Sequence, residues 1–150
     1  MTGPNSTILS RIWWHSCECI SYLNHAETDK TIHSAKTALK LAEESAVRVM
    51  DTLIHFHAAM ANLTTGCIDA GRECLKTLET LAVSGQLMNE VCHHQIAGIL
   101  AWHEGDLARS ESLLSRTVEL MEWFAPHPKR PQMGHDVSIR ETSKQKRGKP

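Results

Sequence analysis

The chain has 150 residues, 41% of them hydrophobic and 22% charged, which is close to ordinary globular usage and provides enough chain for one domain. Only 5% of the residues are aromatic, so aliphatic residues, Ala and Met must fill the core, and this favours helices over sheets. The net charge is −1, no apolar run approaches the ~18 residues of a membrane span, and Arg11 interrupts the opening stretch, so we expect a cytoplasmic protein without membrane contact.

Proline and charge divide the chain at the same point. The five prolines leave residues 5–125 free of the residue that breaks helices. Residues 1–125 hold nine Lys and Arg against fifteen Asp and Glu, whereas residues 126–150 hold seven against two. We therefore predict a helical repeat domain over residues 1–125 and a different kind of segment, which we call the tail, over residues 126–150. The prolines are Pro4, Pro126, Pro128, Pro131 and Pro150.

The tail is rich in Pro, Lys, Arg, Ser and Gln and contains few sizeable apolar residues, too few to offset the entropy of ordering it. We therefore expect a disordered, basic, Pro-containing tail. The run from Lys144 to Lys149 has the charge needed to contact nucleic acid or an acidic partner. Because the tail lacks the aromatic residues that single-strand binders stack on bases, we expect a solvated terminus instead.

Glycines separate segments of helical periodicity within the first 125 residues. Gly66, Gly85 and Gly105 lie 19 and 20 residues apart, and each interval fits one helix and its turn. Asp106 follows the third glycine and is well placed to cap a helix by accepting backbone N–H bonds. The pattern of apolar residues predicts six helices, over residues 7–24, 29–44, 46–64, 68–84, 87–103 and 107–123.

The helices form an internal repeat of pairs. A shift of 39 residues superposes Gly66 on Gly105 and Leu75 on Leu114. A shift of 40 in the other direction finds an earlier copy, in which Ala26 replaces the turn glycine and Ser45 stands where Gly85 would be. We predict that Ala59 and Gly98 lie where the two helices of a hairpin cross, because only small residues fit a close crossing.

These residues resemble the tetratricopeptide (TPR)-like repeats, in which small residues such as Ala97-Gly98 lie at the helix crossing and a pair such as Gly105-Asp106 forms the turn. A repeat near 40 residues looks most like the sensor arm of MalT-like LuxR-type transcriptional regulators. The resemblance covers residues 10–123. It implies an all-α fold, a right-handed α-solenoid of about three antiparallel helical hairpins.

Such repeats are scaffolds whose first helices line a concave surface for partners. The resemblance therefore implies a non-catalytic scaffold for protein–protein or peptide interaction, with protein or peptide as partner. The alternative function is the ligand-sensing arm, or a fragment, of a MalT-like regulator. For the aromatic residues of the expected lining, the alternative role is ordinary packing between helices. The expected lining is Trp13, Ser16, Asn24, Phe56, Met60, Gln95, Ile99, Trp102 and His103.

Catalytic and metal-binding signatures are absent from the sequence. It contains no Cys-x-x-Cys, no Gly-x-Ser-x-Gly and no phosphate-binding glycine loop. A helical-bundle metalloenzyme would need two Glu-x-x-His motifs, and only the one from Glu90 to His93 is present. We expect no enzyme activity, no cofactor and no metal, although His15, Cys17 and Glu18 are a nucleophilic set that folding could assemble.

The last predicted helix carries more apolar residues than one buried face needs. A terminal repeat has no neighbour on one side, and stable solenoids end in a polar capping helix, which is not visible in the sequence before the tail begins. We therefore predict self-association through residues 107–124, or docking of this hairpin on a partner or on a further domain. The apolar residues are Leu113, Leu114, Val118, Leu120, Met121, Trp123 and Phe124.

Overall fold

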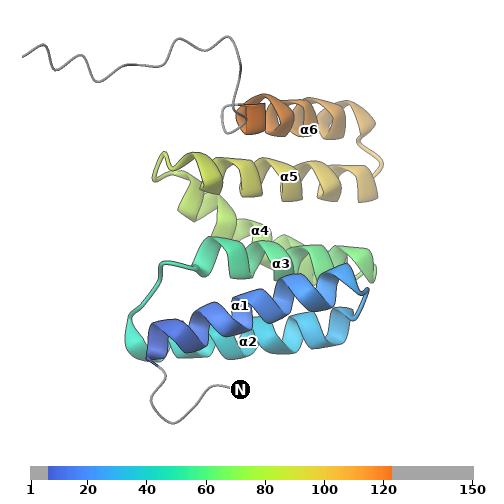
Figure 1. Ribbon diagram of the computed structural model, residues 1–150. Helices are drawn as coiled ribbons and strands as arrows, with labels where there is room; N and C mark the ends of the chain where they lie inside the picture. Colours follow the sequence, from blue (N-terminus) through green and yellow to red (C-terminus); the bar gives the residue numbers. More distant parts are fainter. Residues whose placement is uncertain (1–6, 123–150) are drawn as a thin grey trace, which may run out of the picture.

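The computed structural model describes residues 7–122, which form six α-helices (Figure 1). No strand occurs within residues 7–122, and the all-α prediction is confirmed. None of the helices in this range is both long and apolar enough to cross a membrane. The tail predicted over residues 126–150 lies outside the described residues. The helices are α1 (Ile8–Asn24), α2 (Thr28–Ser45), α3 (Asp51–Thr64), α4 (Ile68–Ala82), α5 (Leu87–His103) and α6 (Leu107–Glu122).

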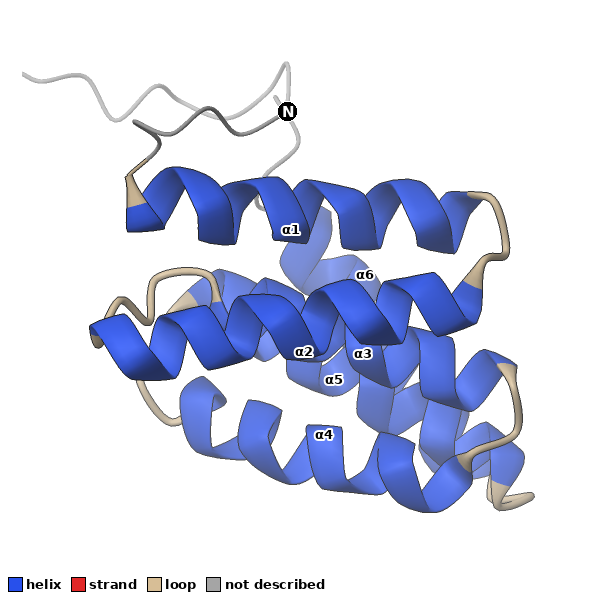
Figure 2. Cartoon of the chain, turned by 90° about the horizontal axis from the view of Figure 1, so that it is seen from below, coloured by secondary structure: helices blue, strands red, loops and turns tan. Residues whose placement is uncertain are grey.

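Consecutive helices pack as antiparallel hairpins, α1 with α2, α3 with α4 and α5 with α6 (Figures 1 and 2). Each hairpin contacts the next one in the chain, because α2 packs on α3 and α4 packs on α5. The first helices of neighbouring hairpins also touch, α1 with α3 and α3 with α5. Among the described helices no other pairs are in contact. The three hairpins therefore follow one another in space in the order of the chain.

Each of the five connections contains one residue in the left-handed region of backbone space, where a side chain is strained and glycine is not. Glycine occupies three of these positions, at Gly66, Gly85 and Gly105, with φ of 76°, 70° and 81°. Alanine occupies the other two, Ala26 and Ala46, each with φ of 57°. The turn substitution predicted at Ala26 is confirmed, while the residue equivalent to Gly85 is Ala46 and not Ser45.

The start of α3 is where the sequence prediction was wrong. The helix begins at Asp51, five residues after the predicted start, because the left-handed Ala46 ends α2 and the chain then crosses to the next hairpin. The Arg48 guanidinium pairs with the buried Asp51 carboxylate at the first turn. Val47 and Met50 pack on the core from this loop, so the apolar pattern continued through a segment that is not helical. The remaining helix ends lie within two residues of those predicted.

The interior consists of two clusters that share neighbours. The first joins α1, α2 and α3, and the second joins α3, α4 and α5. Leu53 and Cys74, both half-buried, pack against both clusters, so the two form one continuous core. The buried members are Ile12, Cys19, Ala35, Ala38, Ala42, Met50, Ile54 and Ala58 in the first, and Ala59, Leu63, Leu78, Cys92, Ile96 and Leu100 in the second.

Glycine at two helix positions allows the helices of a hairpin to approach closely. A Cβ at Gly98 would lie 2.8 Å from Leu114 Cγ, which confirms the predicted crossing of α5 and α6 at this residue. A Cβ at Gly71 would lie 2.5 Å from Leu63 Cδ2, so α4 and α3 cross closely at this residue in the second hairpin. Ala59 is fully buried in the second cluster.

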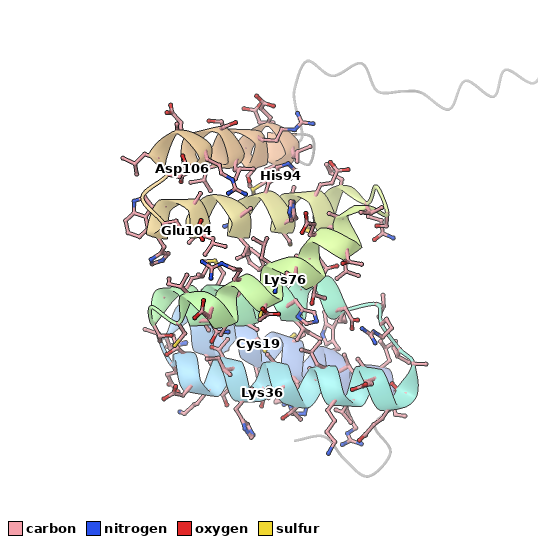
Figure 3. All side chains as sticks on the ribbon, turned by 180° about the vertical axis from the view of Figure 1, so that it is seen from behind. Cys19, Lys36, Lys76, His94, Glu104 and Asp106 are labelled. Atoms are coloured by element: carbon pink, nitrogen blue, oxygen red, sulfur yellow. The ribbon has the colours of Figure 1, made fainter. Side chains whose placement is uncertain are left out.

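The turn into α6 has the predicted cap. Asp106 precedes the first residue of α6, and its carboxylate accepts a hydrogen bond of 3.1 Å from the backbone N–H of Arg109 (Figure 3). This bond satisfies one of the donors that every helix leaves free at its N-terminus. The cap prediction is therefore confirmed.

Candidate functional site

A groove lies between the C-terminal ends of α3 and α5, and we call it the α3/α5 groove. It has a volume of about 390 Å³. The two helices run in the same direction and touch each other, so the same end of each one contributes a wall. The lining residues are Met60, Leu63 and Thr64 from α3, and Ile99, Trp102 and His103 from α5.

The two walls of the groove occupy equivalent positions of the repeat. Each helix contributes residues spaced i, i+3 and i+4, which share one face of a helix. The shift of 39 residues that superposes Gly66 on Gly105 also superposes Met60 on Ile99, Leu63 on Trp102 and Thr64 on His103. The groove is therefore a consequence of the repeat, formed where one face of a first helix meets the same face of the next.

The lining is mostly apolar and none of its six side chains carries a fixed charge. Trp102 is 60% exposed and its ring meets the His103 ring edge to face, with centroids 4.9 Å apart. The Thr64 hydroxyl already donates to the Met60 carbonyl at 2.7 Å, so it offers an acceptor to a ligand. The groove can bind an apolar group and supply one or two hydrogen bonds, but its lining has no fixed positive charge to pair with a phosphate or carboxylate.

Four of the nine residues predicted to line a binding surface come together in this groove: Met60, Ile99, Trp102 and His103. Trp13 lies elsewhere, in a hollow of about 410 Å³ formed with Leu9, Ser10, Val49 and Met50. The other four also lie outside the groove. Asn24 is exposed at the end of α1, and Phe56 and Gln95 are half-buried.

Ser16 is the clearest correction to the predicted lining. Its side chain is 1% exposed, and its hydroxyl has no hydrogen-bond partner among the described residues. A hydroxyl in this position cannot reach a ligand at the surface, so Ser16 belongs to the core of the first hairpin.

Leu63 lines the groove and was missed by sequence reasoning. It is only 1% exposed and also belongs to the second core cluster. The repeat contains a signal that Leu63 lines the groove, because the shift of 39 residues superposes it on Trp102, a member of the expected lining. A residue at the base of a groove is both core and lining, and periodicity alone does not distinguish the two.

A cluster of polar residues surrounds Glu18, in a separate cleft of about 420 Å³ between α1 and α2. Its carboxylate accepts hydrogen bonds from Trp14 Nε1 at 3.0 Å and from Ser34 Oγ at 3.2 Å, and lies 2.8 Å from His15 Nδ1. Burial opposes ionisation, but the bonds from His15, Trp14 and Ser34 outweigh it and lower the pKa of Glu18. Both oxygens are engaged, and the bond from Ser34 joins α1 to α2.

None of the described cysteines lines this cleft. Cys17 is exposed and does not line the cleft around His15 and Glu18. Burial raises the pKa of Cys19 to about 12 and that of Cys92 to about 11, so both thiols are protonated at neutral pH and are poor nucleophiles. Over residues 7–122 no three His, Cys, Asp or Glu side chains gather as metal ligands would.

Comparison with known proteins gives no relative: no family model, curated protein or solved structure matches this chain.

Proposed function

We propose that this protein is a non-catalytic scaffold of TPR-like repeats that binds an apolar peptide segment in the α3/α5 groove. The observation that carries the proposal is the groove itself, in which two repeat-equivalent faces, both mostly apolar, meet at the surface beside the exposed Trp102.

The packing of the helices supports the solenoid part of the proposal. In a solenoid each repeat contacts only its neighbours in the chain. The contacts among the six described helices follow this rule, and the first helices α1, α3 and α5 form a row of their own. A left-handed residue, glycine or alanine, occurs in each of the five connections, as expected if the helices and turns repeat.

The size and chemistry of the groove support a peptide as the occupant. Its volume of about 390 Å³ is near the lower end of the roughly 300–1,000 Å³ typical of ligand pockets and would hold a few large side chains. Amphipathic helices dock with apolar anchors at i, i+3 or i+4, and the groove walls have that spacing. Trp102 is the expected anchor on this side, because exposed Trp residues contribute strongly to the affinity of interfaces.

Selection of peptides from a random displayed library on the full chain tests the proposal. We expect the selected peptides to carry Leu, Phe, Met or Trp at i and i+3 or i+4. Calorimetry should then show that Trp102→Ala weakens binding of a selected peptide about tenfold or more, which corresponds to ~1.4 kcal/mol. The matched control is Trp13→Ala, because Trp13 is 57% exposed, almost as much as Trp102, and lies outside the groove.

Equal affinity of the wild type and Trp102→Ala for the selected peptides would contradict the proposal. Peptides whose binding is lost with Trp13→Ala but kept with Trp102→Ala would place the binding surface on α1 instead. Because Trp102 is mostly exposed, its replacement should leave the helical circular dichroism unchanged, and this separates a loss of binding from a loss of folding.

A further inference from the structure

A row of apolar side chains on α6 faces solvent, and we call it the α6 face. It consists of Leu107, Leu114, Val118 and Met121, which are 64%, 36%, 58% and 53% exposed. Their spacing places them along one line of the helix, beside the buried Ser110 and Thr117. The helix therefore packs on α5 with one part of its apolar surface and leaves the adjacent part uncovered.

The equivalent side of α4 is covered by the next hairpin. The shift of 39 residues relates Leu107 to Ile68 and Leu114 to Leu75, and both of these residues are half-buried against the second core cluster. Arg72 lies on the same side of α4 and bonds to Glu104, at the end of α5, at 2.8 Å. The α6 face is thus the surface on which the first helix of a following hairpin would pack.

The other end of the molecule exposes the complementary surface, which we call the α1 face. The left-handed residues Ala26 and Gly105 follow α1 and α5 and lie 79 residues apart, so this shift relates the two helices. It superposes the exposed Trp13 and Cys17 on Cys92 and Ile96, which are buried against the preceding hairpin. The α1 face consists of Trp13, Trp14, Cys17 and Ile20, all of them exposed.

We propose that the α6 face of one copy packs on the α1 face of a second copy, so that the repeat continues head to tail from chain to chain. The described residues carry both halves of this joint, one at each end of the row of hairpins (Figure 1). Val118 stands where α4 has the exposed Glu79, so the α6 face carries one more apolar residue than the equivalent side of α4. This inference uses the repeat geometry and does not depend on peptide binding in the α3/α5 groove.

Polar residues at the edge of the joint fit the head-to-tail arrangement. In the internal joint Arg72 of α4 meets Glu104. The repeat equivalents of these two residues are Glu111 on α6 and His25 at the end of α1, both exposed. A hydrogen bond from the His25 ring to the Glu111 carboxylate would take the place of the internal ion pair between copies. Because the two surfaces differ, the contact is heterologous and produces open chains or a ring.

Two variants that each block one face give a decisive test by sedimentation analysis of the full chain. Trp13→Glu with Ile20→Lys blocks the α1 face, and Val118→Glu with Met121→Lys blocks the α6 face. The replaced residues are exposed and each pair keeps the net charge, so neither folding nor overall repulsion should change. Val83→Glu with Met88→Lys, at two exposed positions just after α4 and in the first turn of α5, is the matched control.

We expect the wild type and the control to form species larger than one 16.8 kDa chain, with a mass that rises with concentration. Each blocked variant alone should be monomeric. An equimolar mixture should form a one-to-one complex, because one intact α6 face and one intact α1 face remain. A monomeric wild type at high micromolar concentration would overturn the inference. So would an α1-blocked variant that still forms dimers alone, since that result indicates α6 pairing with α6.

Discussion

At the scale of single residues, the two glycines at the hairpin crossings should differ in their tolerance of a side chain. Gly71→Ala places a Cβ 2.5 Å from Leu63 Cδ2 and 2.8 Å from Leu63 Cγ, so the Leu63 side chain, which is only 1% exposed, must shift. We expect a loss of about 1–3 kcal/mol in the free energy of unfolding, measured by urea denaturation. Gly98→Ala meets Leu114, which is 36% exposed and can rotate, so we expect a change within about 1 kcal/mol of zero because alanine also favours helix.

The larger substitution Gly98→Leu should still destabilise the α5–α6 crossing by about 1–3 kcal/mol, because Leu113 Cβ would also lie within 3.3 Å of the new Cβ. A melting temperature raised by Gly98→Leu would mean that the crossing is looser than these distances indicate.

The two alanines in left-handed backbone are sites where glycine should stabilise the fold. Ala26 and Ala46 both have φ of 57°, a conformation that costs an L-residue roughly 1–2 kcal/mol and costs glycine little. We expect Ala26→Gly and Ala46→Gly each to raise the free energy of unfolding by about 0.5–1 kcal/mol once the entropy of the unfolded glycine is included. Ala70→Gly, at an exposed position within α4, is the control and should lower it by a similar amount.

Buried histidines should make the protein less stable in mild acid. Burial lowers the pKa of His57, and it also lowers the pKa of the half-buried His55 and His93. The unfolded chain, with an ordinary His pKa of about 6.5, therefore binds more protons than the native state just below that pH. The contribution of these three histidines to the free energy of unfolding is complete above pH ~6.5 and is lost as the pH falls toward their native pKa values.

We expect the melting temperature of the wild type to fall between pH 7.5 and pH 5.5, a range that lies above the titration of Glu18. The melting temperature of the His57→Leu variant should fall by less over the same range, because this variant lacks one of the buried imidazoles. Identical pH profiles for the two proteins would show that His57 does not contribute.

At the scale of the helices, one buried amide connects three of them. Asn89 in α5 is 7% exposed, donates to the Leu81 carbonyl and to Ser84 Oγ at 3.0 Å each, and accepts from Thr52 Oγ1 at 2.7 Å. Asn89→Leu should lower the free energy of unfolding by about 2–3 kcal/mol, since it removes three hydrogen bonds and takes this partner from the half-buried Thr52 hydroxyl and Leu81 carbonyl. Asn89 has no local sequence signal for this role, because its partners come from α3, from α4 and from the turn before α5.

The matched control for this substitution is Asn62→Leu. The Asn62 amide is half-buried and donates to the carbonyl of Ala58 in its own helix at 2.9 Å. We expect the loss there to be about 1 kcal/mol or less, because no bond between hairpins is broken. Equal losses in the two variants, measured by urea denaturation, would mean that the Asn89 network does not hold the hairpins together.

At the scale of the whole molecule, contacts limited to neighbouring hairpins predict that damage stays local. Ile12→Ala removes a fully buried side chain from the first cluster, which costs about 2–5 kcal/mol at a typical core site. In a solenoid the weakened end unfolds separately from the rest. Hydrogen exchange should therefore accelerate in α1 and α2 and change little in α5 and α6. A uniform acceleration across all six helices would contradict the solenoid proposal.

The helices and turns were largely predictable because their signals are local. Apolar spacing located the helices, the glycines located three of the connections, and the Asp106 carboxylate lies next to the backbone N–H that it caps. The start of α3 was not predictable in the same way. The apolar pattern through Val47 and Met50 has the period of a helix, while the left-handed Ala46 that ends α2 leaves no signature as clear as a glycine.

What only the tertiary structure decided is which apolar residues are covered. Trp13 and Cys92 occupy equivalent positions of the repeat, yet Cys92 is 3% exposed and Trp13 is 57% exposed. Sequence periodicity by itself determined that each of these residues lies on a particular face of a helix. Whether that face meets water or another helix depends on the hairpin packed beside it. Met60 and Ile99 therefore line a groove only because α3 and α5 come into contact there.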